Sequence, residues 1–260
     1  MSVEYIEMGH YPYTDEGQEV PIKWRFLHDS GKRMLLITEF GIDCLPFYTP
    51  MPKPLDKRYF SKEDGLSIEE LVNEKSKKVF DKDGNLYKDI YGYPITSKKY
   101  RGFPLWYPVT WETSTLRNYL NGEFVKKAFS DDERSSILVV PVSSCPSPLN
   151  EAVTGGGTTK DMVFLLNHDS AERYFPLEED RQCIPTPYAD CKSMFHHKDG
   201  FCSWWLRTVG LWEQFDPKEE ERPQNRHCIS VVWNTGRIDL MGMSADTFRC
   251  IRPCIMVRKK

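Results

Sequence analysis

Long hydrophobic runs, a secretory leader and an excess of charge of one sign are all missing from this chain of 260 residues. No apolar stretch reaches the length of about 18 residues that a transmembrane helix needs. The N-terminal segment has neither the basic nor the apolar part of a secretory signal, so we expect a cytoplasmic protein. A net charge of −3 attracts neither nucleic acid nor an anionic membrane, and we expect neither as a partner.

Local motifs of known chemistry are also missing. The sequence has no G-x-S-x-G, no H-E-x-x-H and no paired-cysteine redox motif. The glycines of "VTGGGTTKD" lack the spacing of a phosphate-binding loop. The cysteines and histidines between 183 and 202 lack the close pairing of structural zinc ligands. We therefore expect no metal and no cofactor, although dispersed His, Cys and carboxylate side chains that converge in a cleft remain the enzyme alternative.

The eight cysteines are spread irregularly through a chain that is large enough to form a core without covalent links. We expect thiols, most of them buried as small hydrophobic groups, and keep disulfides as the alternative. Cys250 and Cys254, four residues apart in one expected strand, would face the same side and pack.

The pattern of apolar residues predicts strands at both ends and helices between them. "PIKWRFLHDSGKRMLLIT" alternates and then turns at Gly31, which predicts a β-hairpin. Strands are also expected in "SWWLRTV", in "CISVVWNTGRIDLM" with a turn at 234–236, in "CIRPCIMVRK" and at 162–166. The order of elements predicts an α+β fold whose terminal strands can close one sheet.

Capping residues mark the expected helices. Thr113 or Ser114 can begin the first helix, and Gly122 can end it. A second helix is expected after Ser130, whose capping box closes with Glu133. Short helices are also expected after residue 167, with Asp169 and Glu172 as a capping pair, and after Ser67, with Glu70 as its partner.

Residues 50–109 are more polar and richer in lysine than their surroundings. We interpret them as an insertion within a single domain, 1–260, and place a tight turn at "DKDGN". Aromatic residues at its end and just beyond favour a core role over an assembly interface; they are Tyr100, Phe103, Trp106, Tyr107 and Trp111.

The stretch "CSWWLRTVG" supplies the candidate ligand site. Neighbouring side chains of a strand point to opposite faces, so Trp205 and Arg207 share one face and Trp204 takes the other. An exposed indole beside a guanidinium would form a platform for a sugar or another polar ring. The alternative, which weighs more, buries both tryptophans and ties Arg207 to main-chain carbonyls. Further candidate ligand-binding residues at the same end of the chain are Trp212, Trp233, Asn234, Arg237 and Asp239.

Several segments together resemble a bacterial family of domains of unknown function. They are "PIKWRFLHDSGKRMLLIT", "TWETSTLRNYLNGEFVKKAFSDDERSSI", "DMVFLLNHDSAERYF", "WWLRT" and "IRPCIMV", against a pattern that includes W-x-x-S-x-L-R-x-W-L-N, W-W-L-R-S and V-R-P-A. The departures are Tyr119 for Trp, Asn167 for Ser, Thr208 for Ser and Cys254 for Ala.

The W-W-L-R and R-P signatures also resemble those of C-type-lectin-like and formylglycine-generating-enzyme-like folds. This resemblance implies paired N- and C-terminal strands, short helices and a loop-rich second sheet, and it brings over no catalytic residue. We expect a non-enzymatic binding module that recognises a small polar ligand, such as a glycan, or a protein partner. The alternatives are an enzyme and a structural or assembly subunit.

Overall fold

The computed structural model describes residues 4–49, 109–149, 153–193, 197–213 and 226–259, together with the backbone of two short strands. The chain divides into two compact units. The first consists of residues 1–49, 110–211 and 227–260, and the second of 50–109 and 212–226. In the second unit, β5 (Val72–Asn73) and β6 (Lys78–Val79) form an antiparallel pair. The helix expected after Ser67, the "DKDGN" turn and the aromatic residues between 100 and 107 lie outside the described residues, and the single domain with an insertion stays a prediction.

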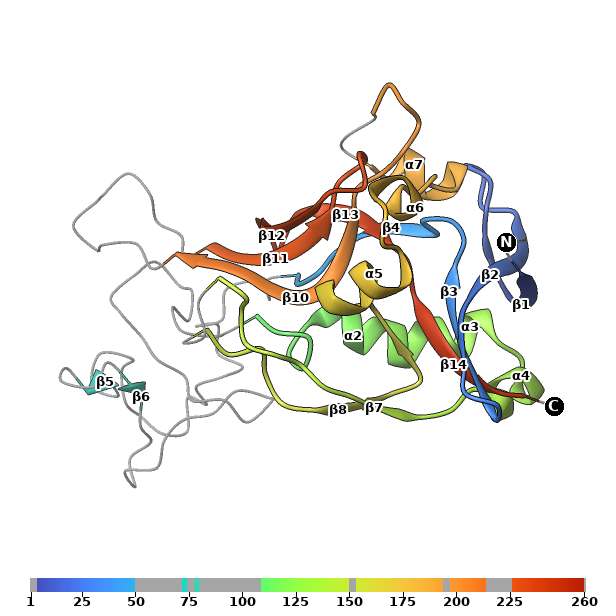
Figure 1. Ribbon diagram of the computed structural model, residues 1–260, viewed down its shortest axis with the longest axis horizontal. Coiled ribbons are helices and arrows are strands. Elements are labelled where there is room, and N and C mark those ends of the chain that lie inside the picture. The colour runs from blue at the N-terminus through green and yellow to red at the C-terminus, as the bar shows by residue number, and fades with distance from the viewer. Residues whose placement is uncertain are drawn as a thin grey trace, which may run out of the picture. The chain divides into compact units, whose positions relative to one another are not determined.

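Strands from the two ends of the chain form one sheet, in which the N-terminal strands and the C-terminal strand lie side by side (Figure 1). All its pairings are antiparallel. Its strands, in spatial order, are β1 (Tyr5–Pro12), β2 (Glu19–Asp29), β3 (Arg33–Thr38), β14 (Cys254–Arg258) and β9 (Val163–Phe164).

A second five-stranded sheet carries the tryptophan doublet on its middle strand. Its strands, in spatial order, are β12 (Ile238–Ser244), β11 (Arg226–Val232), β10 (Trp204–Glu213), β13 (Phe248–Ile251) and β4 (Asp43–Pro46). The β10–β13 pair is parallel, whereas β11–β12 and β13–β4 are antiparallel. Two short strands, β7 (Val140–Val142) and β8 (Thr159–Asp161), pair separately. The described chain is therefore mostly sheet, with a few short helices.

The hairpin expected from the alternating N-terminal segment is confirmed as β2 and β3. Ile22 and Trp24 are buried, while Lys23 between them is exposed. Gly31 has a φ of +80°, which a turn at this position requires. Alternation in the sequence was sufficient here because one face of β2 contacts solvent.

The first helical segment is longer than expected. Ser114 caps α2 (Thr115–Tyr119) by accepting a hydrogen bond from the Arg117 main-chain N–H. The prediction that Gly122 ends the helix is wrong, because a π-helical turn, η2 (Leu120–Phe124), leads into α3 (Val125–Ala128). Buried apolar side chains continue through this turn, so packing holds Gly122 in the helix despite its low propensity.

The other helices are short. They are α4 (Asp131–Ser136), α5 (His168–Tyr174), α6 (Glu178–Arg181) and α7 (Pro187–Cys191). The Ser130–Glu133 capping box of α4 is confirmed. The expected Asp169–Glu172 capping pair is wrong, because Asn167 caps α5 by accepting from the Ser170 N–H. In the strand expected at 162–166, only β9 is regular.

The final stretch of the chain is two strands rather than one. β13 ends at Ile251, and β14 begins at Cys254 in the other sheet. The prediction that Cys250 and Cys254 share one strand face is therefore wrong, since Arg252-Pro253 moves the chain from one sheet to the other. Both sulfurs are buried, as are four of the other cysteines, and all eight cysteines are thiols.

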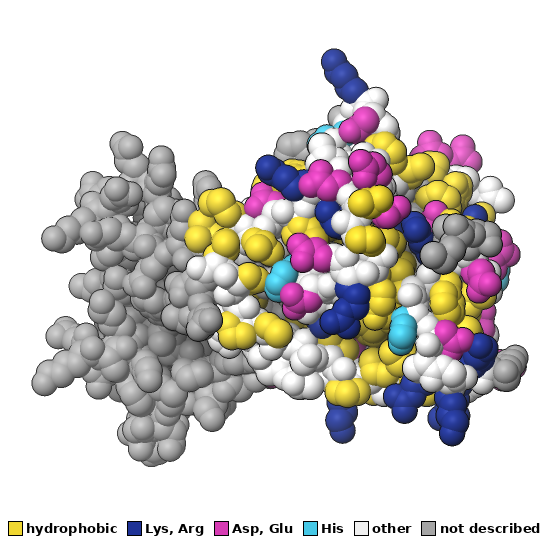
Figure 2. All heavy atoms as spheres, in the orientation of Figure 1, with side chains coloured by type: hydrophobic (Ala, Val, Ile, Leu, Met, Phe, Trp, Pro, Cys, Tyr) yellow, Lys and Arg dark blue, Asp and Glu magenta, His cyan; other side chains and the backbone are white. Residues whose placement is uncertain are grey.

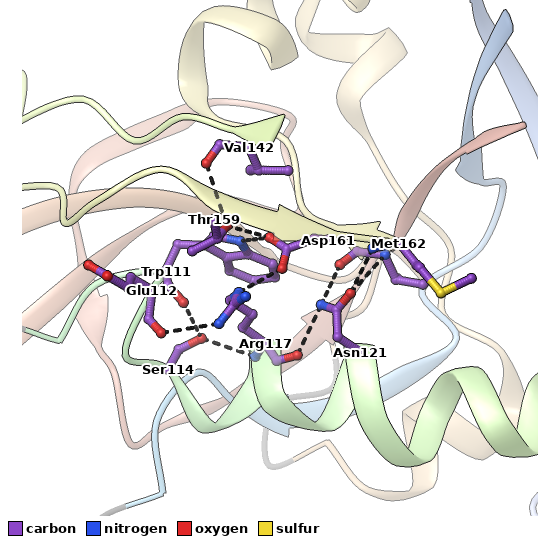
Figure 3. A network of polar contacts seen from close by, with 10 residues as sticks. Trp111, Glu112, Ser114, Arg117, Asn121, Val142, Thr159, Asp161 and Met162 are labelled. Atoms are coloured by element: carbon purple, nitrogen blue, oxygen red, sulfur yellow. Dashed lines mark hydrogen bonds and ion pairs between the residues drawn. The ribbon is translucent and has the colours of Figure 1, made fainter. Parts of the chain in front are cut away.

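Asp161 on β8 connects the first helix to the β7–β8 strand pair (Figure 3). The residue is 1% exposed, and its carboxylate accepts hydrogen bonds from Trp111 Nε1 (2.8 Å), Arg117 Nε (2.7 Å) and Thr159 Oγ1 (2.5 Å). Asn121, one helical turn after Arg117, accepts from the main-chain N–H groups of residues 162 and 163. The polar positions of the W-x-x-S-x-L-R-x-x-L-N motif are therefore occupied by internal contacts that position the helix.

Candidate functional site

Both tryptophans of the doublet are completely buried. Trp204 and Trp205 are each 0% exposed, and their indole N–H groups donate to the main-chain oxygens of Arg181 (3.0 Å) and Leu45 (2.9 Å). The prediction that Trp205 emerges on the surface is wrong, because β10 is a middle strand and both of its faces are covered. The sequence offers little signal for such a strand, because Ser203 precedes the doublet and only Leu206 separates it from Arg207 and Thr208.

Arg207 is also buried, and it holds two loops together. Its guanidinium donates to the main-chain oxygens of Leu165 (2.9 Å) and Ser143 (3.0 Å). Burial lowers the pKa of this guanidinium. The cation over the doublet is instead Arg252, whose guanidinium carbon lies 5.0 Å from the Trp204 ring centroid. The predicted Trp205–Arg207 platform does not exist, and these two side chains stabilise the fold.

Four of the other predicted residues, Trp233, Asn234, Arg237 and Asp239, lie where β11 turns into β12. We call these four, together with Asp199, which was not predicted and contacts Asn234, the turn surface. The turn at 234–236 is confirmed, with the Gly236 N–H donating to the Trp233 carbonyl (2.8 Å). Trp233 and Asn234 are half-buried, and Arg237 is exposed. This is the part of the predicted ligand site that reaches solvent.

Interactions with the protein interior fix the turn surface. The Trp233 indole N–H donates to Asp239 Oδ2 (3.0 Å), and the buried Arg249 guanidinium lies 6.0 Å from the ring centroid. The other Asp239 oxygen accepts from two main-chain N–H groups of β12. Asp239 therefore positions the indole rather than offering a carboxylate to a ligand. Sequence reasoning missed Arg249, since it lies on another strand.

The tip of the turn is held from a second side. Asn234 Nδ2 donates to Asp199 Oδ2 (2.8 Å). A hydrogen bond from the Phe201 main-chain N–H, and then this one from Asn234, hold the pKa of Asp199 below its usual value. The buried Arg181 donates to the main-chain oxygen of Gly236 (2.7 Å). These contacts hold the turn in one conformation. Trp212 is on β10, and its side chain lies outside what the structure describes.

A second polar cluster joins four elements. Asp43 is 2% exposed and accepts from Tyr11 Oη (2.5 Å) and Lys192 Nζ (2.8 Å). Lys192 also donates to Tyr188 Oη (2.8 Å), and Tyr11 shares a hydrogen bond with Tyr119 (2.8 Å). Burial, followed by the Asp43 charge, raises the pKa of Tyr11. Burial alone would lower the pKa of Lys192, but its hydrogen bonds to Asp43 and Tyr188 outweigh this and raise it. The cluster closes on itself and anchors α7 to β1 and β4.

One arrangement resembles the hydroxyl, imidazole and carboxylate of hydrolases. His168 Nδ1 lies 3.4 Å from Thr208 Oγ1, and its Nε2 lies 3.1 Å from Asp169 Oδ1. The Thr208 side chain, however, belongs to a residue that is 5% exposed, and its oxygen accepts the main-chain N–H of His168 (2.9 Å). A nucleophile must reach its substrate, so this arrangement favours a structural role.

Within the described ranges, no group of three or more His, Cys, Asp and Glu side chains is arranged to hold a metal ion. In the same part of the chain, no helix has the length and apolar character to cross a membrane. The face seen in Figure 2 carries acidic and basic side chains with apolar ones between them. Figure 2 therefore gives no indication of a surface of one charge on this face.

The chain is a mostly-sheet protein with short helices whose exposed candidate site is a rigid turn between two strands. Residues 86–259 match the model of a family described as a domain of unknown function (DUF6273). The match covers more than half of the chain, and the chain belongs to this family. No curated protein and no solved structure matches it.

Proposed function

We propose that the chain is a non-enzymatic binding module whose turn surface takes a small polar ligand, of which a glycan is the best fit. The observation that carries this proposal is the half-buried Trp233, whose N–H is already bonded to Asp239. An indole held in this way presents apolar ring surface in one orientation. Sugar rings stack on such a surface through their C–H groups, while their hydroxyls need polar partners at the rim.

The rim of the turn surface offers these partners. Arg237 is exposed and can donate, and the Asp199 carboxylate can accept beside the Asn234 amide. The hydrogen bonds of the turn are made before binding, so little conformational entropy is lost when a ligand docks. A rigid aromatic with adjacent donors and acceptors is typical of a binding surface.

The fold adds a weaker argument. We propose a C-type-lectin-like core, supported by the pairing of β14 with β3 and by a separate second sheet that carries long connections. A bacterial origin and a soluble cytoplasmic location, with a ligand or a protein as partner, belong to the same proposal.

A glycan array tests the proposal. We expect the parent protein to retain a defined set of glycans and Trp233→Ala to reduce their binding at least about tenfold, which corresponds to 1.4 kcal/mol. Arg237→Ala, at an exposed position, should weaken binding without changing the melting temperature. The matched control is Tyr5→Ala, which removes an aromatic that is 37% exposed on β1 of the first sheet and should leave binding unchanged. Failure of the parent to retain any glycan, or equal binding by Trp233→Ala, would refute the proposal.

A further inference from the structure

Four buried thiols form a continuous row through the second sheet. Neighbouring thiols interact in the order Cys183, Cys202, Cys250, Cys44, and the sulfurs of Cys202 and Cys250 both lie beside Gly41. None of the four residues is more than 6% exposed. Cys44 lies on β4 and Cys250 on β13, whereas Cys202 precedes β10 and Cys183 follows α6. Residues far apart in the sequence therefore bring four sulfur atoms into one contiguous set.

The two ends of the row are also matched along the backbone. Cys44 and Cys250 are direct partners in the antiparallel register of β4 and β13. The Cys202 N–H donates to the Cys183 carbonyl (2.7 Å). Residues directly opposite in antiparallel strands have Cα atoms about 4.5–5.5 Å apart, and disulfides span about 4.4–6.8 Å. The Cys44–Cys250 pair thus has a backbone separation that a disulfide can join, and the main chains of Cys183 and Cys202 are in direct contact.

The middle contact of the row differs from the two end pairs. Cys202 and Cys250 are not register partners; Cys250 donates its N–H to the carbonyl of residue 203 instead. Gly41 packs against this contact, and a Cβ at that position would lie 3.1 Å from Cys202 Sγ and 3.2 Å from Cys250 Sγ. The strand register of Cys44 with Cys250 and the main-chain hydrogen bond between Cys183 and Cys202 therefore favour these two pairs for disulfide formation.

We propose that the row is a site of covalent modification, at which a low-molecular-weight disulfide converts Cys44–Cys250 and Cys183–Cys202 into two protein disulfides. In each pair, one thiolate attacks the small disulfide, forms a mixed disulfide and releases one small thiol. The second thiolate then attacks the protein sulfur of the mixed disulfide and releases the other small thiol. Two electrons and two protons pass from each cysteine pair to one oxidant molecule, which leaves as two thiols.

Burial determines when this reaction takes place. Desolvation raises the pKa of Cys183 and of Cys202 well above the usual thiol value. The thiolate is the attacking species, so the closed fold reacts slowly. Oxidation therefore proceeds through local opening or while the chain folds. We expect refolding in the presence of the oxidant to be much faster in forming the disulfides than incubation of the folded protein.

The experiment uses the full chain with Cys145→Ser and Cys191→Ser, which removes the two exposed thiols. The reduced protein is unfolded in urea, refolded with oxidised glutathione, alkylated and digested for mass spectrometry. Before alkylation, we expect an intact mass lower than that of the reduced protein by four hydrogen atoms. After digestion, we expect one peptide pair linked through Cys44 and Cys250 and another linked through Cys183 and Cys202. The oxidised protein should unfold at a higher urea concentration than the reduced protein.

Variants test the pairing independently. Cys44→Ser should remove one disulfide and keep the Cys183–Cys202 link. The matched control Cys254→Ser, also buried but outside the row, should keep both. Unchanged thiols after refolding, stable glutathione adducts on the four cysteines, or links among other cysteines would each overturn the proposal. The link map of the parent decides the matter even where a variant does not fold.

Discussion

Replacing Asp161 by asparagine changes one atom of the contact that joins the first helix to β8. Asp161 Oδ1 accepts from Arg117 Nε, while Oδ2 accepts from Trp111 Nε1 and Thr159 Oγ1. An amide has one acceptor oxygen and one NH₂ group. Whichever way it is turned, the NH₂ faces either the guanidinium or the indole and hydroxyl donors, so at least one buried donor loses its acceptor.

The size of the effect follows from burial. The Asp161 side chain is 0% exposed, and the Arg117 side chain is 21% exposed. Breaking a fully buried ion pair costs about 3–5 kcal/mol, and a buried donor left unsatisfied costs about 1–3 kcal/mol. Water can reach part of Arg117, so we expect Asp161→Asn to lower the free energy of unfolding by about 2–4 kcal/mol.

Urea unfolding, followed by tryptophan fluorescence, measures this loss. With a slope of about 3 kcal/mol per molar urea for a chain of this size, the midpoint should fall by about 1 M. The matched control is Asp132→Asn, the same change at an exposed position of α4, which should stay within about 0.5 kcal/mol of the parent. A loss for Asp161→Asn no larger than that of the control would show that the Asp161 contacts do not hold the helix.

Three further predictions concern a cap and two glycines. Burial alone would raise the pKa of Glu133, but hydrogen bonds from Gly9 and Ser130 outweigh this effect and hold the pKa below the ordinary value of 4.5. The charged carboxylate therefore stabilises the fold above that pH, and this stabilisation is lost as the pH falls and the carboxylate becomes protonated. Glu133→Gln should therefore cost about 0.5–1 kcal/mol near neutral pH and progressively less below it, as urea midpoints across a pH series would show; a pH-independent difference would contradict this. Gly242→Ala should cost about 2–4 kcal/mol, since φ is +74° and the new Cβ would meet a main-chain oxygen at 2.1 Å. The helical Gly122→Ala has open space and should gain about 0.5–1 kcal/mol; equal melting shifts would contradict the reasoning.

Local signals in the sequence predicted the local structure well. The alternation of "PIKWRF" and the turn at Gly31 predicted the first hairpin, and Ser130 with Glu133 predicted the start of α4. Each of these depends on residues a few positions apart, whose interactions are the same in most folds. Gly122 failed as a stop signal because the buried stripe beyond it packs in the tertiary structure.

The candidate site was predicted only in part. The turn at 234–236 and its half-exposed Trp233 were in reach of the sequence, because turn chemistry is local. Trp205 was misplaced, since period-two alternation says which side chains share a face and not whether that face is covered. The partners Asp199 and Arg249 left no local signal, as they come from other segments.

By itself, the sequence determined the β2–β3 hairpin, the turn at 234–236 and the cap of α4, and it indicated that strands at both ends could close one sheet. Only the tertiary structure decided that β10 is covered on both faces, that Arg207 serves main-chain carbonyls and that four distant thiols meet. The physical reason is that hydrogen-bond capping and alternation act over a few residues, whereas burial depends on which strands become neighbours.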